Sequence, residues 1–99
     1  MSKYYTYILA NKRNGTIYTG VTNDLIRRVH EHKRGLNDSF TKKYKVHKLV
    51  WYASFESISE AIYMEKRIKN WKREWKTELI TQYNPNWNDL YNTLEKDEF

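Results

Sequence analysis

The first twenty-one residues hold the feature that most constrains the fold: two runs of aromatic and β-branched residues separated by an Asn-Gly pair. Residues 4–10 and residues 16–21 both have the composition of β-strands. Between them, Asn14 and Gly15 favour the positive backbone φ angles that a tight hairpin turn requires. The chain is therefore predicted to begin as an antiparallel β-hairpin.

Helical spacing follows the hairpin. A first helix is predicted after residue 23, with Thr22 or Asn23 as its N-cap and Gly35 as its C-terminal stop. Residues 37–46 show no clean period and are expected to form a loop, and residues 49–55 read as a third strand. The apolar positions of the first helix are Leu25, Val29, His32 and Leu36.

A capping box predicts where the next helix begins, because Ser57 is followed three residues later by Glu60. Helical spacing continues to about residue 82, with a break near Asn70, and the Pro at residue 85 ends the helical segment. The apolar face of this segment is predicted to hold Ile58, Ala61, Ile62 and Ile68, followed by Trp71, Trp75 and Leu79.

Length and composition predict a single α/β domain over residues 1–99, with a core at about 4–90 and an acidic tail at 91–99. The chain has no cysteine, which excludes a disulfide framework and a thiolate metal site. No stretch is long and apolar enough for a transmembrane helix, and the N-terminus lacks a signal-peptide pattern. A cytoplasmic location is expected.

Charge favours a polyanionic partner. The formal net charge is +6, and the last five residues are acidic, so the rest of the chain is more basic still. Such a surface attracts nucleic acid first and anionic membrane second, although surface Lys and Arg that serve only solubility are the alternative. No helix combines a bulky apolar face with a basic one, which argues against a membrane partner. The candidate nucleic-acid-binding residues are Arg28, Lys42, Lys43, Lys45, Arg67, Lys69 and Arg73.

Glu65 lies on the apolar face of the second helical segment, between Ala61 and Ile68. A buried carboxylate must be neutralised, hydrogen-bonded or bound to a cation, because burying an unpaired charge is costly. The alternatives to a bound cation are a salt bridge to a neighbouring Arg and a position at the edge of the face that reaches water.

Arg28 and His32 are four residues apart and are therefore predicted to share one helix face. A guanidinium suits bidentate contact with a phosphate, and an imidazole donates to a phosphate oxygen or moves a proton. The alternative is an ordinary amphipathic helix with a histidine at its edge. His30 and His47 are expected to be surface residues.

Tyrosines are concentrated on the predicted hairpin. Tyr5 and Tyr7 fall on one face of the first strand, and Tyr18 precedes Gly20 on the second. Cross-strand packing is the alternative interpretation of these rings. A free phenol has a pKa of about 10, so it becomes a useful general base only where a metal or another cation lowers that pKa.

The order of these residues resembles the GIY-YIG nuclease superfamily, in particular its small stand-alone members, over about residues 4–90. The first half-motif lacks its glycine, and Val21 stands where DNA-repair relatives carry a lysine, so that lysine's role in activating water is missing. The matching motifs are Tyr5-Thr6-Tyr7, Tyr18-Thr19-Gly20, Arg28, His32, the segment 60–65 and Pro85-Asn86-Trp87-Asn88.

The resemblance implies an α+β fold in which helices flank a three-stranded antiparallel sheet, with the active cleft across the sheet. It makes Tyr7 and Tyr18 the tyrosines of the two half-motifs and Arg28 the ligand of the scissile phosphate. It makes Glu65 the sole carboxylate ligand of one Mg²⁺ or Mn²⁺ ion. Asn88 is the late polar residue that lines the site, and His32 falls where several relatives carry a histidine.

The activity implied is divalent-metal-dependent hydrolysis of phosphodiester bonds by an endonuclease, with DNA favoured over RNA as the substrate. The alternative is a nucleic-acid-binding module on the same fold that cuts slowly or not at all. Larger relatives take their specificity from appended DNA-binding domains. Here recognition is expected to depend on backbone contacts and shape, or on a partner protein.

Overall fold

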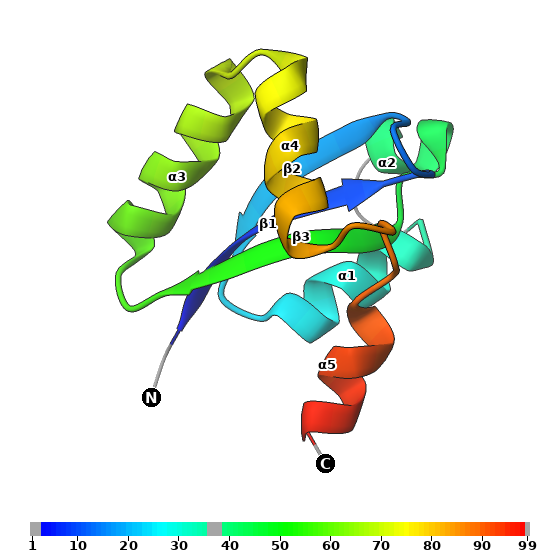
Figure 1. Ribbon diagram of the computed structural model, residues 1–99. Coiled ribbons are helices and arrows are strands. Elements are labelled where there is room, and N and C mark those ends of the chain that lie inside the picture. Colours follow the sequence, from blue (N-terminus) through cyan, green and yellow to red (C-terminus); the bar gives the residue numbers. More distant parts are fainter. Residues whose placement is uncertain (1–2, 36–38, 99) are drawn as a thin grey trace.

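The computed structural model describes residues 3–35 and 39–98 (Figure 1). Strands β1 (Tyr4–Ala10), β2 (Ile17–Thr22) and β3 (Lys48–Phe55) form an antiparallel sheet in the order β2-β1-β3. The predicted strands and the predicted fold class are confirmed. The helices are α1 (Leu25–Lys33), α2 (Ser39–Tyr44), α3 (Ile58–Asn70), α4 (Arg73–Tyr83) and α5 (Tyr91–Glu98).

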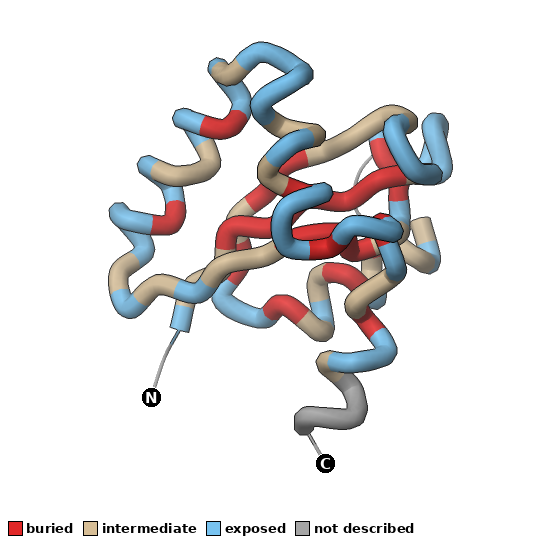
Figure 2. Tube along the Cα trace, in the orientation of Figure 1, coloured by how far each residue is buried: buried red, intermediate tan, exposed pale blue. Residues whose placement is uncertain are grey.

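Two hydrophobic clusters lie on opposite faces of the sheet, with α3 and α4 on one side and α1 and α5 on the other (Figure 1). Side chains of β1 alternate between the clusters, Tyr7 and Leu9 facing α1, and Ile8 and Ala10 facing α3 and α4. Because β1 is the central strand, residues 6–10 are all buried (Figure 2).

The turn between β1 and β2 uses Asn14 and Gly15 differently from the prediction. Asn14 has the expected positive φ, 57°. The prediction was wrong for Gly15, which is not among the residues with positive φ. Space requires the glycine instead, because a Cβ there would lie 2.1 Å from the Oδ1 atom of Asn11. That oxygen also accepts a hydrogen bond from the backbone N–H of Thr16 at 2.9 Å, which closes the turn.

The N-cap of α1 is Asp24, so the prediction of Thr22 or Asn23 was wrong. The Asp24 side chain accepts from the backbone N–H of Arg27, and the Thr22 hydroxyl accepts from the N–H of Asp24. The Thr22 hydroxyl therefore stabilises the turn between the end of β2 and the N-cap residue Asp24. At the other end, Gly35 has a φ of 67° and follows the helix, as predicted.

Helix α2 lies where a loop was predicted, at residues 37–46. The helix has fewer than two turns, so it is too short to show a period in the sequence. Its burial is set by a contact with α1, because Thr41 is buried against His32 while Lys42 and Lys43 are exposed. Leu36, an apolar position in the prediction, lies outside the described residues.

Helix α3 begins as the capping box predicted, since the Ser57 side chain accepts from the backbone N–H of Glu60 at 3.2 Å. The predicted break is also confirmed, because α3 ends at Asn70 and α4 begins at Arg73. Helix α4 ends at Tyr83, immediately before the Asn-Pro pair that was predicted to stop it.

The apolar face of these helices is narrower than predicted. Ala61 and Ile68 are buried, but Ile58 and Ile62 are 44% and 38% exposed. The small Ala61 lets the α3 backbone approach the sheet so closely that the Thr6 hydroxyl donates to its carbonyl at 2.7 Å, and the larger neighbours lie to either side. On α4, Trp75 is likewise exposed rather than buried, and Ile80 fills the core instead.

The acidic segment begins against the core. Helix α5 covers residues 91–98, and Tyr91 belongs to the cluster on the α1 side of the sheet. Just before it, the Asp89 carboxylate accepts from the backbone N–H of Leu49 and pairs with Lys33. Among the described residues, none of the helices has the length and apolar character needed to span a membrane.

Candidate active site

The site is built around Tyr7 at the middle of the central strand. Tyr7 lies directly opposite Gly20 in the β1–β2 ladder. A Cβ on Gly20 would lie 2.6 Å from the Tyr7 hydroxyl oxygen and 2.7 Å from the ring carbon that bears it. The glycine of the Tyr-x-Gly motif therefore leaves space on β2 for the phenol of β1.

The buried phenol is joined to a histidine and a threonine. The Tyr7 oxygen is 3.0 Å from Nε2 of His32, and Nδ1 of the same ring is 3.1 Å from the Thr41 hydroxyl. All three side chains are buried, with exposed fractions of 0%, 3% and 1%. Strand β1 and helices α1 and α2 each contribute one member to this hydrogen-bonded chain.

Tyr18 brings a second phenol to the same cluster and is the less buried of the two. Its ring centroid lies 5.3 Å from that of His32 and 6.4 Å from that of Tyr7. On its other side it contacts the ring of Phe40 at 6.2 Å, and Phe40 is 41% exposed. The structure therefore brings Tyr7, Tyr18 and His32 together, and only Tyr18 of the three is more than marginally exposed.

Arg28 lies one turn before His32 on α1, and its guanidinium is 3.4 Å from the carboxylate of Glu31. Its side chain is 41% exposed, against 75% for Arg27, which pairs with the same carboxylate at 3.3 Å. The predicted shared face is only partly realised, because the His32 ring is directed into the core while Arg28 remains at the surface.

Glu65 comes from α3, which covers the opposite face of the sheet, over β1 and β2. Its side chain is 19% exposed, and its carboxylate pairs with the Lys69 ammonium at 2.9 Å. A salt bridge was one of the two structural alternatives for this residue, although the partner expected was an arginine. Within residues 3–35 and 39–98 there is no group of three or more His, Cys, Asp or Glu side chains that could hold a metal.

Asn88 lies at the β3 edge of the sheet, whereas Tyr18 is on β2. The backbone N–H of Asn88 donates to the side-chain oxygen of Asn84. The side-chain amide of Asn84 donates in turn to the backbone carbonyls of Asn88 and Val50. The Asn88 side chain is exposed. The structure does not bring Asn88 to the tyrosines, because β3 lies between it and Tyr7, and both β3 and β1 lie between it and Tyr18.

The candidate nucleic-acid-binding cations are spread over two sides of the molecule. Lys42, Lys43 and Lys45 are exposed on and after α2, beside Phe40. Arg67 and Lys69 are exposed on α3. Arg73 has a structural role, because its guanidinium donates to the carbonyls of Asn14 and Gly15 and so fixes the β1–β2 turn to the start of α4. His30 and His47 are exposed, as predicted.

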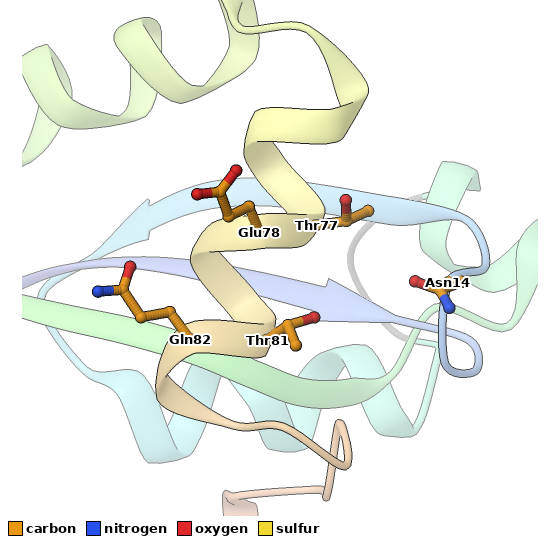
Figure 3. A pocket seen from close by; sticks show the side chains of 5 residues that line it. All are labelled: Asn14, Thr77, Glu78, Thr81 and Gln82. Carbon is orange, nitrogen blue, oxygen red and sulfur yellow. The ribbon is translucent and has the colours of Figure 1, made fainter.

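A pocket of about 450 Å³ lies elsewhere, on the outer side of α4. Figure 3 shows Thr77 and Thr81 on the flank of α4 nearer the turn that carries Asn14, with Glu78 and Gln82 on the other flank. Among the described residues that line it there is a carboxylate and no cation, so the pocket is poorly suited to a polyanion. The tyrosine cluster faces the other side of the sheet.

Sequence reasoning missed Thr41 and Phe40. Both lie in α2, where the absence of a period led to the prediction of a loop. Nothing in the local sequence marks a threonine as the partner of a histidine nine residues earlier. The arrangement as a whole supplies a partly exposed phenol, a buried phenol–imidazole pair and an arginine at the surface, which are groups suited to proton transfer beside a phosphate.

Comparison with known proteins gives a family match over most of the chain. The family model described as the GIY-YIG catalytic domain matches residues 3–91. The UPF0213 protein of Staphylococcus saprophyticus is 35% identical over 82 residues, which is 83% of this chain and 99% of that protein. The UPF0213 protein of Staphylococcus aureus strain Mu3 is 34% identical with the same coverage.

A solved structure extends the likeness to three dimensions. The solution NMR structure of a UPF0213 protein from Bacillus halodurans is 32% identical, covers 81% of this chain and 84% of its own, and has a TM-score of 0.51. That similarity includes the three-stranded sheet and its flanking helices. On the match over residues 3–91, together with these relatives, the chain belongs to the GIY-YIG catalytic domain family.

Proposed function

We propose that the protein is a divalent-metal-dependent endonuclease that hydrolyses phosphodiester bonds, with DNA favoured over RNA as its substrate. The observation that carries the proposal is the cluster of Tyr18 with the Tyr7–His32 pair. A partly exposed phenol next to an imidazole is an arrangement that can accept a proton from water where a bound cation favours the phenolate form. Family membership supports the same class of reaction.

We assign the role of general base to Tyr18, because it is the phenol that a solvent water can reach. Tyr7 is fully buried, so its role is to hold His32 in place beside the Tyr18 ring. Arg28 is the phosphate ligand. Its guanidinium has one carboxylate partner at the surface, and it stabilises the charge that develops on the phosphoryl oxygens once it turns to the substrate.

The donor set suits a hard divalent cation that keeps most of its water. Glu65 offers a single carboxylate that is mostly shielded from solvent, and the described residues around it provide no further acid or imidazole cluster. Mg²⁺ is characteristically bound by one or two carboxylates and several waters. Glu65 would hold the ion, which when bound supplies charge stabilisation at the phosphoryl oxygen. The ion must compete with Lys69 for that carboxylate.

The substrate is proposed to lie along the outer edge of β2, the strand that carries Tyr18. Helix α1 follows β2 directly, and α3 packs over β1 and β2, so both Arg28 and Glu65 belong to helices that flank this strand. The exposed lysines of α2 continue the basic surface beside Phe40 and Tyr18. A role for Asn88 stays a prediction, as do a cytoplasmic location and a partner protein.

The test is cleavage of end-labelled single-stranded, duplex and branched DNA and of matched RNA, with Mg²⁺, with Mn²⁺ and with chelator. Wild type is expected to cut only with metal. Tyr18→Phe is expected to slow cleavage by about 10²- to 10⁴-fold, the usual contribution of a general base. Tyr83→Phe is the matched control, because Tyr83 is 70% exposed on α4, away from the cluster.

The alternative function, a nucleic-acid-binding module, is separated by the same experiment. A module of that kind would retain substrate in a gel-shift assay and leave it intact under every metal condition. Equal cleavage by wild type and Tyr18→Phe would instead preserve the nuclease and overturn the assignment of its base.

A further inference from the structure

Helix α2 makes two separate contacts with the tyrosine–histidine cluster. The Thr41 hydroxyl oxygen lies 3.1 Å from Nδ1 of His32. The ring centroid of the neighbouring Phe40 lies 6.2 Å from the ring centroid of Tyr18. Thr41 is only 1% exposed, although it belongs to a helix whose lysines are in solvent. A hydroxyl buried at such a position, on the far nitrogen of a histidine that contacts a tyrosine, calls for a functional explanation.

The chemistry of a neutral imidazole gives one. One ring nitrogen carries the proton and the other offers a lone pair, and the hydrogen bond made by either nitrogen decides which is which. A phenol holds its proton at neutral pH unless its pKa is lowered, and it is a stronger donor than an aliphatic hydroxyl. The favoured arrangement therefore has the Tyr7 O–H donating to Nε2 and the Nδ1–H donating to the Thr41 oxygen.

Ring orientation depends on the same contact. A half-turn of the imidazole about its Cβ–Cγ axis replaces both nitrogens by carbons at the positions that Tyr7 and Thr41 occupy. The hydrogen bond to Thr41 opposes that turn from the side facing away from the tyrosines. Without it, the Tyr7 contact at 3.0 Å is left to oppose a change of tautomer or orientation next to Tyr18, whose ring centroid is 5.3 Å away.

We propose that Thr41 is a positioning residue that holds His32 in the Nδ1–H tautomer, with Nε2 directed at Tyr7, and thereby holds the phenol of Tyr18 in its working place. For its effect on catalysis this inference rests on the proposed function. Helix α2 is then part of the site, since undocking it would release His32 and Tyr18 together.

Three variants test the kinetic consequence. Thr41→Val keeps the shape and removes the hydroxyl, and it is expected to lower kcat by about tenfold or more with KM within twofold, as for other partners that orient a working imidazole. Thr41→Ser keeps the hydroxyl and is expected to restore kcat to within about threefold of wild type. Thr6→Val is the matched control, because Thr6 is also buried and its hydroxyl donates to the Ala61 carbonyl on the other face of the sheet.

A spectroscopic measurement tests the same inference independently of cleavage. Long-range ¹H–¹⁵N correlation on protein labelled at histidine distinguishes the two tautomers, and the chain has three histidines, of which His30 and His47 are exposed references. Wild type, Thr41→Ser and Thr6→Val are expected to show the Nδ1–H form of His32. Thr41→Val is expected to show a mixture of tautomers.

The outcomes separate the two proposals. An inactive wild type with a tautomer that depends on Thr41 would refute the nuclease and keep the positioning role. An active Thr41→Val with the wild-type tautomer would refute the positioning role and keep the nuclease. Equal loss of kcat in Thr41→Val and Thr6→Val would show a general effect of losing a buried hydroxyl, and it would also overturn the inference.

Discussion

Gly20→Ala is the substitution whose effect the geometry fixes most closely. The new methyl group would lie 2.6 Å from the Tyr7 oxygen and 2.7 Å from Cζ, about 1 Å inside ordinary van der Waals contact. Tyr7 is fully buried and bonded to His32, so its ring has no free space into which it can turn. Either β2 must separate from β1 or the phenol must leave its hydrogen bond.

The magnitude follows from these two costs. Overpacking a buried site costs about 1–3 kcal/mol, and losing a buried hydrogen bond costs about 1 kcal/mol more. A total of about 3 kcal/mol lowers the melting temperature of a domain of this size by about 15 °C. The sign is informative, because alanine in place of a strand glycine without a clash would stabilise the fold by about 0.5–1 kcal/mol.

The assay is a double-mutant cycle measured by thermal and urea unfolding. Gly20→Ala is combined with Tyr7→Leu, which removes the ring that the methyl group would meet. In that background Gly20→Ala is expected to cost about 1 kcal/mol, because the methyl group would still lie 3.1 Å from Cε1 of Tyr18. The difference from the cost in wild type gives a coupling energy of about 2 kcal/mol between the two positions. A melting temperature for Gly20→Ala at or above wild type would refute the reasoning, and so would a cycle that shows simple additivity.

Three further predictions follow from the site. Glu65→Gln is expected to abolish metal-dependent cleavage. It should change the free energy of unfolding by no more than about 0.5 kcal/mol, because it removes only an i,i+4 ion pair with Lys69. The control variant Glu60→Gln, on the same helix, should cut normally. Arg28→Ala is expected to slow cleavage by orders of magnitude and weaken binding only modestly. Arg27→Ala, the more exposed neighbour, should be nearly active, and the reverse result would mean that the phosphate ligand is misassigned. Affinity for nucleic acid is expected to fall steeply with salt in fluorescence titrations, because contacts between Lys and Arg side chains and the phosphates supply that affinity. An affinity that does not change with salt would contradict this prediction.

Interactions between residues close together in the sequence determined the main strands and helices. The aromatic and β-branched runs and the Asn-Gly pair specified the hairpin, and Ser57 with Glu60 specified where α3 begins. Each of these signals acts between residues a few positions apart, so it is visible without the fold. The spacing from Tyr7 to Glu65 identified the family for the same reason, because a motif is a pattern along the chain.

Only the tertiary structure decided how these parts meet. It converted the expected loop into α2, and it turned His32 inward to Thr41 and Tyr7 rather than outward with Arg28. It also buried one tyrosine and left the other within reach of water, and it placed Asn88 at the β3 edge. These outcomes depend on contacts between residues that are distant in sequence, and on the packing of α1 and α2 against one face of the sheet. The spacing of residues along the sequence shows neither these contacts nor this packing. The candidate base and its supporting residues could therefore be identified only from the folded structure.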